Sequence, residues 1–265
     1  MANNLSKTQI DRLGDRLRKG EITEADLRLL DEYRRSFHEA YEFVVEAVRN
    51  DLGLEPTGRP AKSTTSITEK LLRESIRLTQ VQDIAGCRLI APGILEQDRA
   101  VSSLTKLFES VSVADRRISP SNGYRAIHVI VTYEEKVVEI QVRTSLQHVW
   151  AELSEKMSDV FDPAIKYGGG QDSLRKLLLT WSDVIGTEEN IEQALGDTQL
   201  RIDSLLSQEA LSEDDQTELL QLQREVLTQL EKQATRREGN LTAIREAIQS
   251  LGRVQRAGEL NDISN

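Results

Sequence analysis

Two runs of β-branched and apolar residues in the middle of the chain limit its possible folds more than any other feature. They cover residues 126–133 and 137–142, and only three residues separate them. Such runs are typical of strands, and so short a connection predicts an antiparallel hairpin. A third apolar run, at residues 83–90, suits a buried strand. The middle of the chain is therefore predicted to form a β-sheet.

Helical patterns lie on both sides of this sheet. Residues 6–18 are predicted to form a helix that ends at Gly20. Thr23 then caps a long helix that runs to about Asn50, and residues 53–60 form a loop. The other expected elements are helices at residues 63–78, 95–109 and 144–160, a short strand at 111–113 and a turn at 119–123. The pattern predicts an α+β fold in which helices flank a sheet.

The chain after residue 172 has helical patterns throughout. We expect a break at Gly186, and a capping box of Ser212 and Asp215 that begins the last helix. Gly239 interrupts the apolar face of that helix. This face comprises Leu219, Leu222, Val226, Leu230, Ala234, Leu241, Ile244, Ile248 and Leu251. The spacing predicts an antiparallel helical hairpin of the coiled-coil kind, with irregular heptads.

The apolar stripe of this hairpin must be buried against another surface. That surface is the rest of the chain, a second copy in a homo-oligomer, or a regulatory protein partner, and a homo-oligomer is the simplest of these. The chain as a whole is expected to divide into N-terminal helices at residues 1–50, a sheet-containing domain at residues 51–172 and a helical region at residues 173–265.

Composition excludes several classes of protein. No run approaches the roughly 18 apolar residues of a membrane helix, and the N-terminus lacks the apolar segment of a secretory signal. Cys87 is the single cysteine, which excludes a disulfide framework and a cysteine-rich zinc site. We therefore expect a cytoplasmic protein without a membrane partner.

Charge is distributed unevenly along the chain. The net charge of -10 disfavours general binding to nucleic acid. Residues 59–88 nevertheless carry six basic side chains against three acidic ones. A basic segment within an acidic protein is a candidate site for a small polyanion such as a nucleotide.

Lys62, Ser66 and Lys70 are spaced four residues apart around the start of a predicted helix. Side chains at this spacing share one face of a helix. Two ammonium groups, a hydroxyl group and the helix dipole would converge there, which is a phosphate-binding arrangement. The alternative is a basic helix face that contacts only solvent.

Asp83 and Glu139 are carboxylates in predicted strands. Asp83 begins the third apolar run, where it needs a partner or an ion. In the second strand of the hairpin, alternation places Glu139, Gln141 and Arg143 on one face and apolar side chains on the other. That polar face is either the solvent side of the hairpin or the floor of a cleft. In a cleft, the two carboxylates could hold Mg²⁺, which prefers oxygen ligands.

Two ring-bearing side chains near the hairpin also allow two interpretations each. Tyr124 follows Gly123 in a predicted turn, so its ring is either available to stack on a base or an ordinary loop side chain. His128 lies at the start of the first hairpin strand. It is either a catalytic group or a histidine whose hydrogen bonds are satisfied within the fold.

Four segments, taken together and in order, resemble the synthetase domain of the RelA/SpoT family of alarmone synthetases. They are the helix with Lys62, Ser66 and Lys70, Asp-Ile-Ala-Gly-x-Arg at residues 83–88, Asn-Gly-Tyr-Arg-x-x-His at residues 122–128, and Val-Glu-Ile-Gln-Val-Arg-Thr at residues 138–144. The resemblance covers roughly residues 40–167 and implies a mixed sheet flanked by helices, as in nucleotidyltransferases. It also implies transfer of the β,γ-pyrophosphate of ATP to the ribose 3′-hydroxyl of GDP or GTP, which makes (p)ppGpp.

The resemblance also implies a role for each matching residue. Asp83 and Glu139 would hold Mg²⁺, and Glu139 would help to deprotonate the attacking 3′-hydroxyl. The residues implied in ATP binding are Arg59, Lys62, Ser66, Lys70 and Arg88, with the arginines stacking on adenine. The residues implied in acceptor binding are Asn122, Tyr124, His128, Gln141 and Arg143, with Tyr124 stacking on the acceptor base.

The sequence departs from the family pattern at two places. Arg59 and Lys62 are one residue further apart than usual because Ala61 is inserted, so the adenine contact of Arg59 is in question. The lysine that usually precedes the Asn-Gly-Tyr-Arg motif is absent, and Arg116 or Arg117 would have to replace it at the acceptor phosphates.

Two other functions stay open. A toxin-type relative would transfer the same pyrophosphate to the 3′ end of tRNA, and the Arg116-Arg117 pair is compatible with an RNA acceptor. A non-catalytic nucleotide-binding module would instead use its helical tail to engage a partner. The sequence contains neither the His-Asp pair of the family's hydrolase domain nor a segment that resembles its ribosome-sensing domains. We therefore expect a small form that only synthesises.

Overall fold

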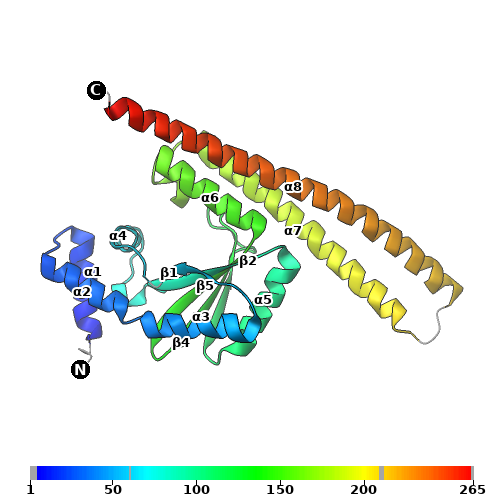
Figure 1. Cartoon of the computed structure of the whole chain (residues 1–265), viewed down its shortest axis with the longest axis horizontal. Helices are drawn as coiled ribbons and strands as arrows, with labels where there is room; N and C mark the ends of the chain where they lie inside the picture. Colours follow the sequence, from blue (N-terminus) through cyan, green and yellow to red (C-terminus); the bar gives the residue numbers. More distant parts are fainter. Residues whose placement is uncertain (1–4, 60, 209–211, 264–265) are drawn as a thin grey trace. The chain divides into compact units, whose positions relative to one another are not determined.

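The computed structural model describes residues 5–59, 61–208 and 212–263, and it contains a mixed five-stranded sheet (Figure 1). Its strands, in the order β1-β2-β5-β4-β3, are β1 (Thr57–Arg59), β2 (Ala85–Ala91), β5 (Lys136–Thr144), β4 (Ile127–Tyr133) and β3 (Val111–Asp115). The pairs β1–β2 and β4–β5 are antiparallel. The predicted α+β class is confirmed, whereas β1 lies where the sequence predicts only a loop.

The hairpin of β4 and β5 turns more tightly than expected. Tyr133 pairs with Lys136, so the connection is the two residues Glu134 and Glu135. Both have a positive φ, 46° and 64°, as a type I′ hairpin turn requires. Lys136 therefore belongs to the strand and not to the turn.

The two faces of β5 differ as the alternation predicts. Val138, Ile140 and Val142 are fully buried in the hydrophobic core. The opposite face carries Glu139 and Arg143, whose residues are only 6% and 5% exposed. Since these charged groups are also buried, this face is not an ordinary solvent-facing side of a hairpin.

The chain forms two compact units, and the first contains the N-terminal helices. It comprises Met1–Leu89, Ala100–Ala114 and Ile127–Val142. Its helices are α1 (Lys7–Lys19), α2 (Glu24–Arg35), α3 (His38–Leu52), α4 (Thr64–Arg73) and the 3₁₀-helix η1 (Leu78–Gln80). The predicted caps are confirmed: Gly20 ends α1 with a φ of 73°, and Thr23 and Asp26 form a capping box on α2. The expected boundaries at residues 50 and 172 stay a prediction.

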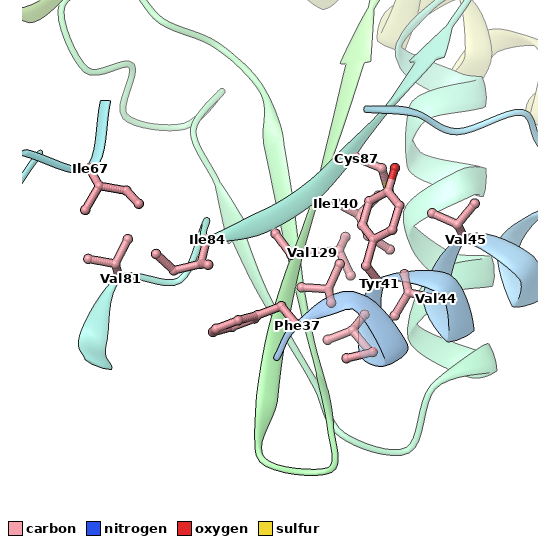
Figure 2. Close-up of a cluster of buried hydrophobic side chains, with 14 of the residues drawn as sticks. Phe37, Tyr41, Val44, Val45, Ile67, Val81, Ile84, Cys87, Val129 and Ile140 are labelled. Carbon is pink, nitrogen blue, oxygen red and sulfur yellow. The ribbon is translucent and has the colours of Figure 1, made fainter. Parts of the chain in front are cut away.

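The core of this unit lies between α3 and the sheet. Figure 2 shows Tyr41 and Val44 of α3 beside Val129 of β4 and Ile140 of β5. Cys87 of β2 belongs to the same cluster and is buried. The apolar spacing of α3 is therefore explained by its packing on the strands.

Two helices of this unit end earlier than the sequence predicts. The expected long helix up to about Asn50 is divided into α2 and α3 at Ser36 and Phe37. Ser36 Oγ donates a hydrogen bond to the Tyr33 carbonyl oxygen at 2.6 Å, and the Phe37 ring packs edge-on against the Tyr33 ring. Helix α4 ends at Arg73 and not at residue 78, because the backbone at Glu74 is extended.

The second unit contains the long C-terminal helices. It comprises Ile90–Arg99, Asp115–Ala126 and Arg143–Asn265. Its helices are α6 (Ser145–Val160), η2 (Ile165–Tyr167), α7 (Asp172–Leu206) and α8 (Glu213–Ile263), while α5 (Ile94–Leu107) begins in this unit and ends in the first. Helices α7 and α8 lie side by side as the predicted hairpin (Figure 1). Ser212 and Asp215 form the predicted capping hydrogen bonds.

The helix break expected at Gly186 does not occur, and Gly239, expected only to interrupt an apolar stripe, does not break its helix either. Both glycines lie inside continuous helices. A Cβ atom at Gly186 would lie 3.4 Å from the guanidinium of Arg125, so the glycine leaves room for that side chain. At Gly239 the helix surface is open, and the cost of a glycine in a helix, about 1 kcal/mol, is too small to interrupt it.

Much of the apolar stripe on α8 is buried within this unit. Leu241 and Ile244 join a cluster with Trp150 and Leu153 of α6. Nearer the hairpin loop, the buried residues of the two helices are Ile202, Leu205, Leu219 and Val226. Leu230 of the same stripe remains 46% exposed, and self-association through the hairpin stays a prediction. Within the described ranges, no helix combines the length and apolarity needed to cross a bilayer.

Candidate active site

Asp83 lies between two lysines in the first unit, two residues before β2. Its Oδ2 accepts a hydrogen bond from Lys62 Nζ at 2.6 Å, and its Oδ1 accepts one from Lys70 Nζ at 2.8 Å. About a fifth of each side chain is exposed. The structure thus brings together three residues that the sequence predicts for phosphate and metal binding.

The charge of this cluster follows from the pKa of Asp83. Burial raises that pKa, but the positive charges and hydrogen bonds of Lys62 and Lys70 outweigh burial and hold it below its usual range. Asp83 is therefore an anion at neutral pH. One carboxylate between two ammonium groups leaves an excess of one positive charge, which favours the approach of a polyphosphate.

The start of α4 fixes the lysines relative to β2. The backbone N–H of Lys62 donates to the carbonyl oxygen of Ile84 at 2.8 Å, which ties this segment to the residues that precede β2. Ser63 is the N-cap and accepts a hydrogen bond from the Ser66 N–H. Ser66 consequently lies in the first turn of the helix, where backbone N–H groups and the helix dipole favour anions.

Glu139 occupies the polar face of β5 with two predicted acceptor residues around it. Gln141 Nε2 donates to Glu139 Oε1 at 2.7 Å, and His128 Nδ1 lies 3.5 Å from the same oxygen. His128 pairs with Gln141 in the hairpin register. Among the described residues, Oε2 of Glu139 makes no hydrogen bond, so it is the oxygen that remains for a ligand.

Strand β2 approaches β5 closely beside Glu139. A Cβ atom at Gly86 would lie 2.7 Å from the backbone oxygen of Glu139, which is closer than real Cβ contacts. The glycine of the Asp-Ile-Ala-Gly motif is therefore needed for close packing of the strands. It allows the strand that follows Asp83 to lie directly against the strand that carries Glu139.

The predicted adenine contacts can be placed only in part. Arg88 is half-buried on the face of β2 that also contains Gly86. The backbone of Arg59 pairs with Gly86 in the β1–β2 register. The side chain of Arg59 lies outside the described part of the chain, so its predicted contact with adenine stays a prediction.

Tyr124 and Arg143 are paired in the second unit. Arg143 Nη2 donates to the Tyr124 hydroxyl at 3.1 Å, and the guanidinium carbon lies 5.2 Å from the centre of the tyrosine ring. The Trp150 ring lies 6.4 Å from the same ring. Tyr124 is therefore a half-buried side chain with a fixed orientation, and not a loosely exposed loop residue.

The turn that carries Tyr124 depends on its glycine. Asn122 and Gly123 both have a positive φ, 53° and 86°, and a Cβ atom at Gly123 would lie 2.9 Å from the Trp150 ring. The Asn122 side chain packs directly against Gly168 in the glycine-rich loop after η2. The backbone conformation and the lack of space for a side chain explain the Asn-Gly pair of this motif.

The two arginines that precede this turn differ in their contacts. Arg117 forms ion pairs with Asp115 and Asp98 at 2.7 and 2.8 Å, and it donates to the Gln97 side chain at 3.1 Å. Arg116 is exposed, and its side chain forms no hydrogen bond or ion pair within the described residues. Arg116 is thus the candidate to replace the missing lysine, whereas Arg117 is held in the fold.

The second unit contains a buried polar network that the sequence patterns do not predict. It consists of Gln97, Arg117, Arg125, Gln147 and Glu189. Thr144 and Gln147 form a capping box at the start of α6, which their spacing could have indicated. No local pattern marks Glu189, because its partner Arg125 lies 64 residues away in the chain.

Comparison with known proteins agrees with the motifs. Residues 58–158 match the region found in RelA / SpoT proteins. An uncharacterized protein from Mycobacterium tuberculosis is 38% identical over 111 residues, which cover 40% of this chain and 41% of that protein. A GTP pyrophosphokinase from Photobacterium angustum is 26% identical over 155 residues, or 54% of this chain and 21% of the relative. These likenesses therefore cover only part of each relative.

Among solved structures, the small alarmone synthetase 1 from Bacillus subtilis is similar with a TM-score of 0.49 and 23% identity, over 67% of this chain and 99% of the other. The family match begins at Gly58 and includes Lys62, Lys70, Asp83 and Glu139. Residues 58–158 of this chain therefore contain a match to the region found in RelA / SpoT proteins.

Proposed function

We propose that this protein is a pyrophosphokinase that transfers the β,γ-pyrophosphate of ATP to the ribose 3′-hydroxyl of GDP or GTP and so makes (p)ppGpp. The observation that carries the proposal is the position of Asp83 between Lys62 and Lys70 within the matched region. One partly matching relative is named as a GTP pyrophosphokinase and another as a probable GTP diphosphokinase, and these names support the proposal.

Binding of ATP would exchange the partners in this cluster. Lys62 and Lys70 would turn from the carboxylate to the phosphates, joined by the Ser66 hydroxyl and the first turn of α4. Each ammonium group would keep an anionic partner throughout, so little electrostatic energy is lost in the exchange. Arg88, half-buried on the neighbouring strand, would contact the adenine.

The residues present fit a magnesium ion. Asp83 is ionised, and Glu139 has an oxygen outside the contacts with Gln141 and His128. Within the described residues there is no cluster of three potential metal ligands, so substrate phosphates would have to complete the coordination. Mg²⁺ is commonly held in this way, by one or two carboxylates and phosphate oxygens. When bound, it would neutralise negative charge that develops on the phosphates.

Glu139 would act as the general base of the transfer. It would accept the proton of the 3′-hydroxyl while that oxygen attacks the β-phosphorus of ATP and AMP leaves. Gln141 and His128 on one carboxylate oxygen would hold the other oxygen in position. Because the chemistry is an in-line displacement, positioning and neutralisation of charge should provide most of the rate.

The acceptor nucleotide would bind at the turn that carries Tyr124. The Tyr124 ring would stack on the base, and Asn122 and Arg143 would support it. Arg116 would contact the acceptor phosphates, since Arg117 is already paired with Asp115 and Asp98.

The test is a transfer assay with ATP labelled at the γ-phosphate. The protein is incubated with Mg²⁺ and, in separate reactions, GDP, GTP, ATP or tRNA, and the labelled product is identified. We expect label on GDP or GTP and none with Glu139→Gln. Label on tRNA alone would replace the proposal with the toxin-type reaction. Equal background from wild type and Glu139→Gln with every acceptor would defeat both enzymatic functions.

A further inference from the structure

Glu189 of α7 connects two of the motif segments in the second unit. This carboxylate is buried, with 5% of the residue exposed, and it lies outside residues 58–158. Its Oε2 accepts hydrogen bonds from Arg125 Nε at 3.0 Å and Arg125 Nη2 at 2.5 Å. Its Oε1 accepts a hydrogen bond from Gln147 Nε2 at 2.6 Å. Both oxygens therefore have partners.

The Arg125 contact fixes the turn that carries Tyr124. Arg125 directly follows Tyr124 in the sequence, and its guanidinium lies against Gly186, one turn before Glu189 on α7. Two hydrogen bonds from a charged donor to a buried carboxylate are among the strongest polar contacts in a protein. Without that carboxylate, the guanidinium would be left partly buried with a missing partner.

The Gln147 contact fixes the end of the motif at residues 138–144. Gln147 Oε1 accepts a hydrogen bond from the backbone N–H of Thr144, the residue that follows Arg143. Arg143 in turn donates to the Tyr124 hydroxyl. Glu189 thus acts on Tyr124 along two routes, one through Arg125 and one through the segment of Arg143 and Thr144.

Other contacts of α7 support the same turn. The Trp150 indole N–H donates to the carbonyl oxygen of Leu178 at 2.8 Å. A Cβ atom at Gly123 would lie 3.2 Å from Ser182 Cβ. One face of α7, from residue 178 to residue 189, therefore forms the support on which the Tyr124 turn rests.

We propose that Glu189 is a positioning residue for the acceptor nucleotide: through Arg125 and Gln147 it holds Tyr124 and Arg143 in the arrangement that receives the acceptor. This inference rests on the proposed function. It assigns to the C-terminal hairpin a part in acceptor binding, although Glu189 itself does not touch the substrate.

Glu188→Gln provides a matched control for Glu189→Gln. Glu188 is the neighbouring buried carboxylate on the same helix, with 7% exposed, but its partner is Arg236 of α8 at 2.9 Å. Either substitution removes one buried negative charge that is paired with an arginine. Among the described residues, Glu189 accepts three hydrogen bonds and Glu188 accepts one, so Glu188→Gln should lose less stability. Only Glu189→Gln should disturb the Tyr124 turn.

The first measurement is steady-state kinetics with ATP and GDP. We expect Glu189→Gln to raise the KM for GDP about tenfold, because it weakens charge-assisted hydrogen bonds. The KM for ATP should stay unchanged, and Glu188→Gln should change neither value. A double-mutant cycle compares Arg125→Gln, Glu189→Gln and the variant that carries both changes. The double variant should have the same KM for GDP as either single variant, since both changes remove the same contact.

The second measurement is amide hydrogen exchange at residues 120–126 in the 265-residue chain without nucleotide. We expect faster exchange there in Glu189→Gln and wild-type rates in Glu188→Gln. Unchanged exchange in Glu189→Gln would overturn the inference. The inference would also be overturned if the two variants showed the same decrease in kcat and the same increase in the KM for ATP and for GDP. That result would indicate that Glu189 has only a structural role. If the wild-type protein labels no acceptor, the proposed function fails. The inference about acceptor binding then fails with it. Amide hydrogen exchange would still show separately whether Glu189 holds the Tyr124 turn.

Discussion

At the scale of single residues, Asp83 is held by the same lysines that are proposed to bind ATP. Its carboxylate competes with phosphate for Lys62 and Lys70, at 2.6 and 2.8 Å. Removing its charge should therefore affect ATP binding in opposite directions with and without metal. Without metal, the negative charge of Asp83 would weaken the attraction of the lysines for the ATP phosphates. With Mg²⁺, the same charge would strengthen ATP binding through the metal ion.

We predict that Asp83→Asn binds ATP at least as tightly as wild type in the presence of EDTA, and that it transfers no pyrophosphate in the presence of Mg²⁺. Titration calorimetry and the labelled-ATP assay measure the two effects. Lys70→Met is the control and should weaken ATP binding about tenfold in EDTA, because a charge-assisted contact is lost. Weaker binding by Asp83→Asn in EDTA would contradict the proposed exchange of partners.

A second prediction concerns the close packing of β2 on β5. Gly86→Ala places a Cβ atom 2.7 Å from the backbone oxygen of Glu139. We expect a loss of about 1–3 kcal/mol in the free energy of unfolding, as for other overpacked sites. Urea denaturation measures it. Gly239→Ala is the control and should stabilise the chain, because among the described residues no atom beyond its own turn of helix lies within 4 Å of the new Cβ, and alanine favours a helix.

At the scale of elements, α8 is held to α6 by the buried half of its apolar stripe. Ile244 is fully buried in the cluster that contains Trp150. We predict that Ile244→Ala lowers the free energy of unfolding by about 2–5 kcal/mol, the usual cost of deleting a buried aliphatic side chain. Leu227→Ala, at a position 64% exposed, should change it by less than about 0.5 kcal/mol. Tryptophan fluorescence during urea unfolding compares them, and equal effects would argue against this packing.

The elements that were predicted correctly have their signals close together in the sequence. Thr23 and Asp26 mark the start of α2, and the β-branched runs mark the hairpin. The break at Ser36 could not be predicted, because the apolar spacing continues through it and a local turn overrides that spacing. The helix break predicted at Gly186 is wrong for a different reason. This glycine leaves room for the side chain of Arg125, which lies far away in the chain.

The same distinction applies to the candidate site. Alternation along β5 was enough to place Glu139 and Gln141 on one face. The pairing of Asp83 with both lysines depends on how α4 meets β2, and no spacing encodes that contact. Glu189 is more remote still, because its role depends on a helix that packs on the motifs from outside the matched region.

At the scale of the whole molecule, acidic side chains with lowered pKa values link stability to pH. A hydrogen bond from Arg16, with further bonds from Thr23, lowers the pKa of Asp26 to about 2. Burial raises the pKa values of Asp83 and Asp115, but their basic partners lower them below the usual range. An unfolded aspartate titrates near pH 3.9, at roughly the usual peptide value. The contribution of these groups is therefore complete above about pH 4 and is lost as the pH falls through their folded-state values.

We predict a lower urea midpoint at pH 3 than at pH 7. In Asp26→Asn this difference should become smaller, because the Arg16–Asp26 pair no longer changes with pH. Circular dichroism at both pH values measures the midpoints. Identical midpoints for wild type at pH 3 and pH 7 would show that these carboxylates do not stabilise the fold.

The burial of Cys87 has a practical consequence for experiments on this protein. Burial raises the pKa of its thiol to about 12, and the chain contains no other cysteine. Since thiolates are the species that react with maleimides, the folded chain should be almost inert to such dyes. A cysteine introduced at an exposed position, such as Leu227 on α8, would then be the one site that takes a fluorophore, without removal of the native residue.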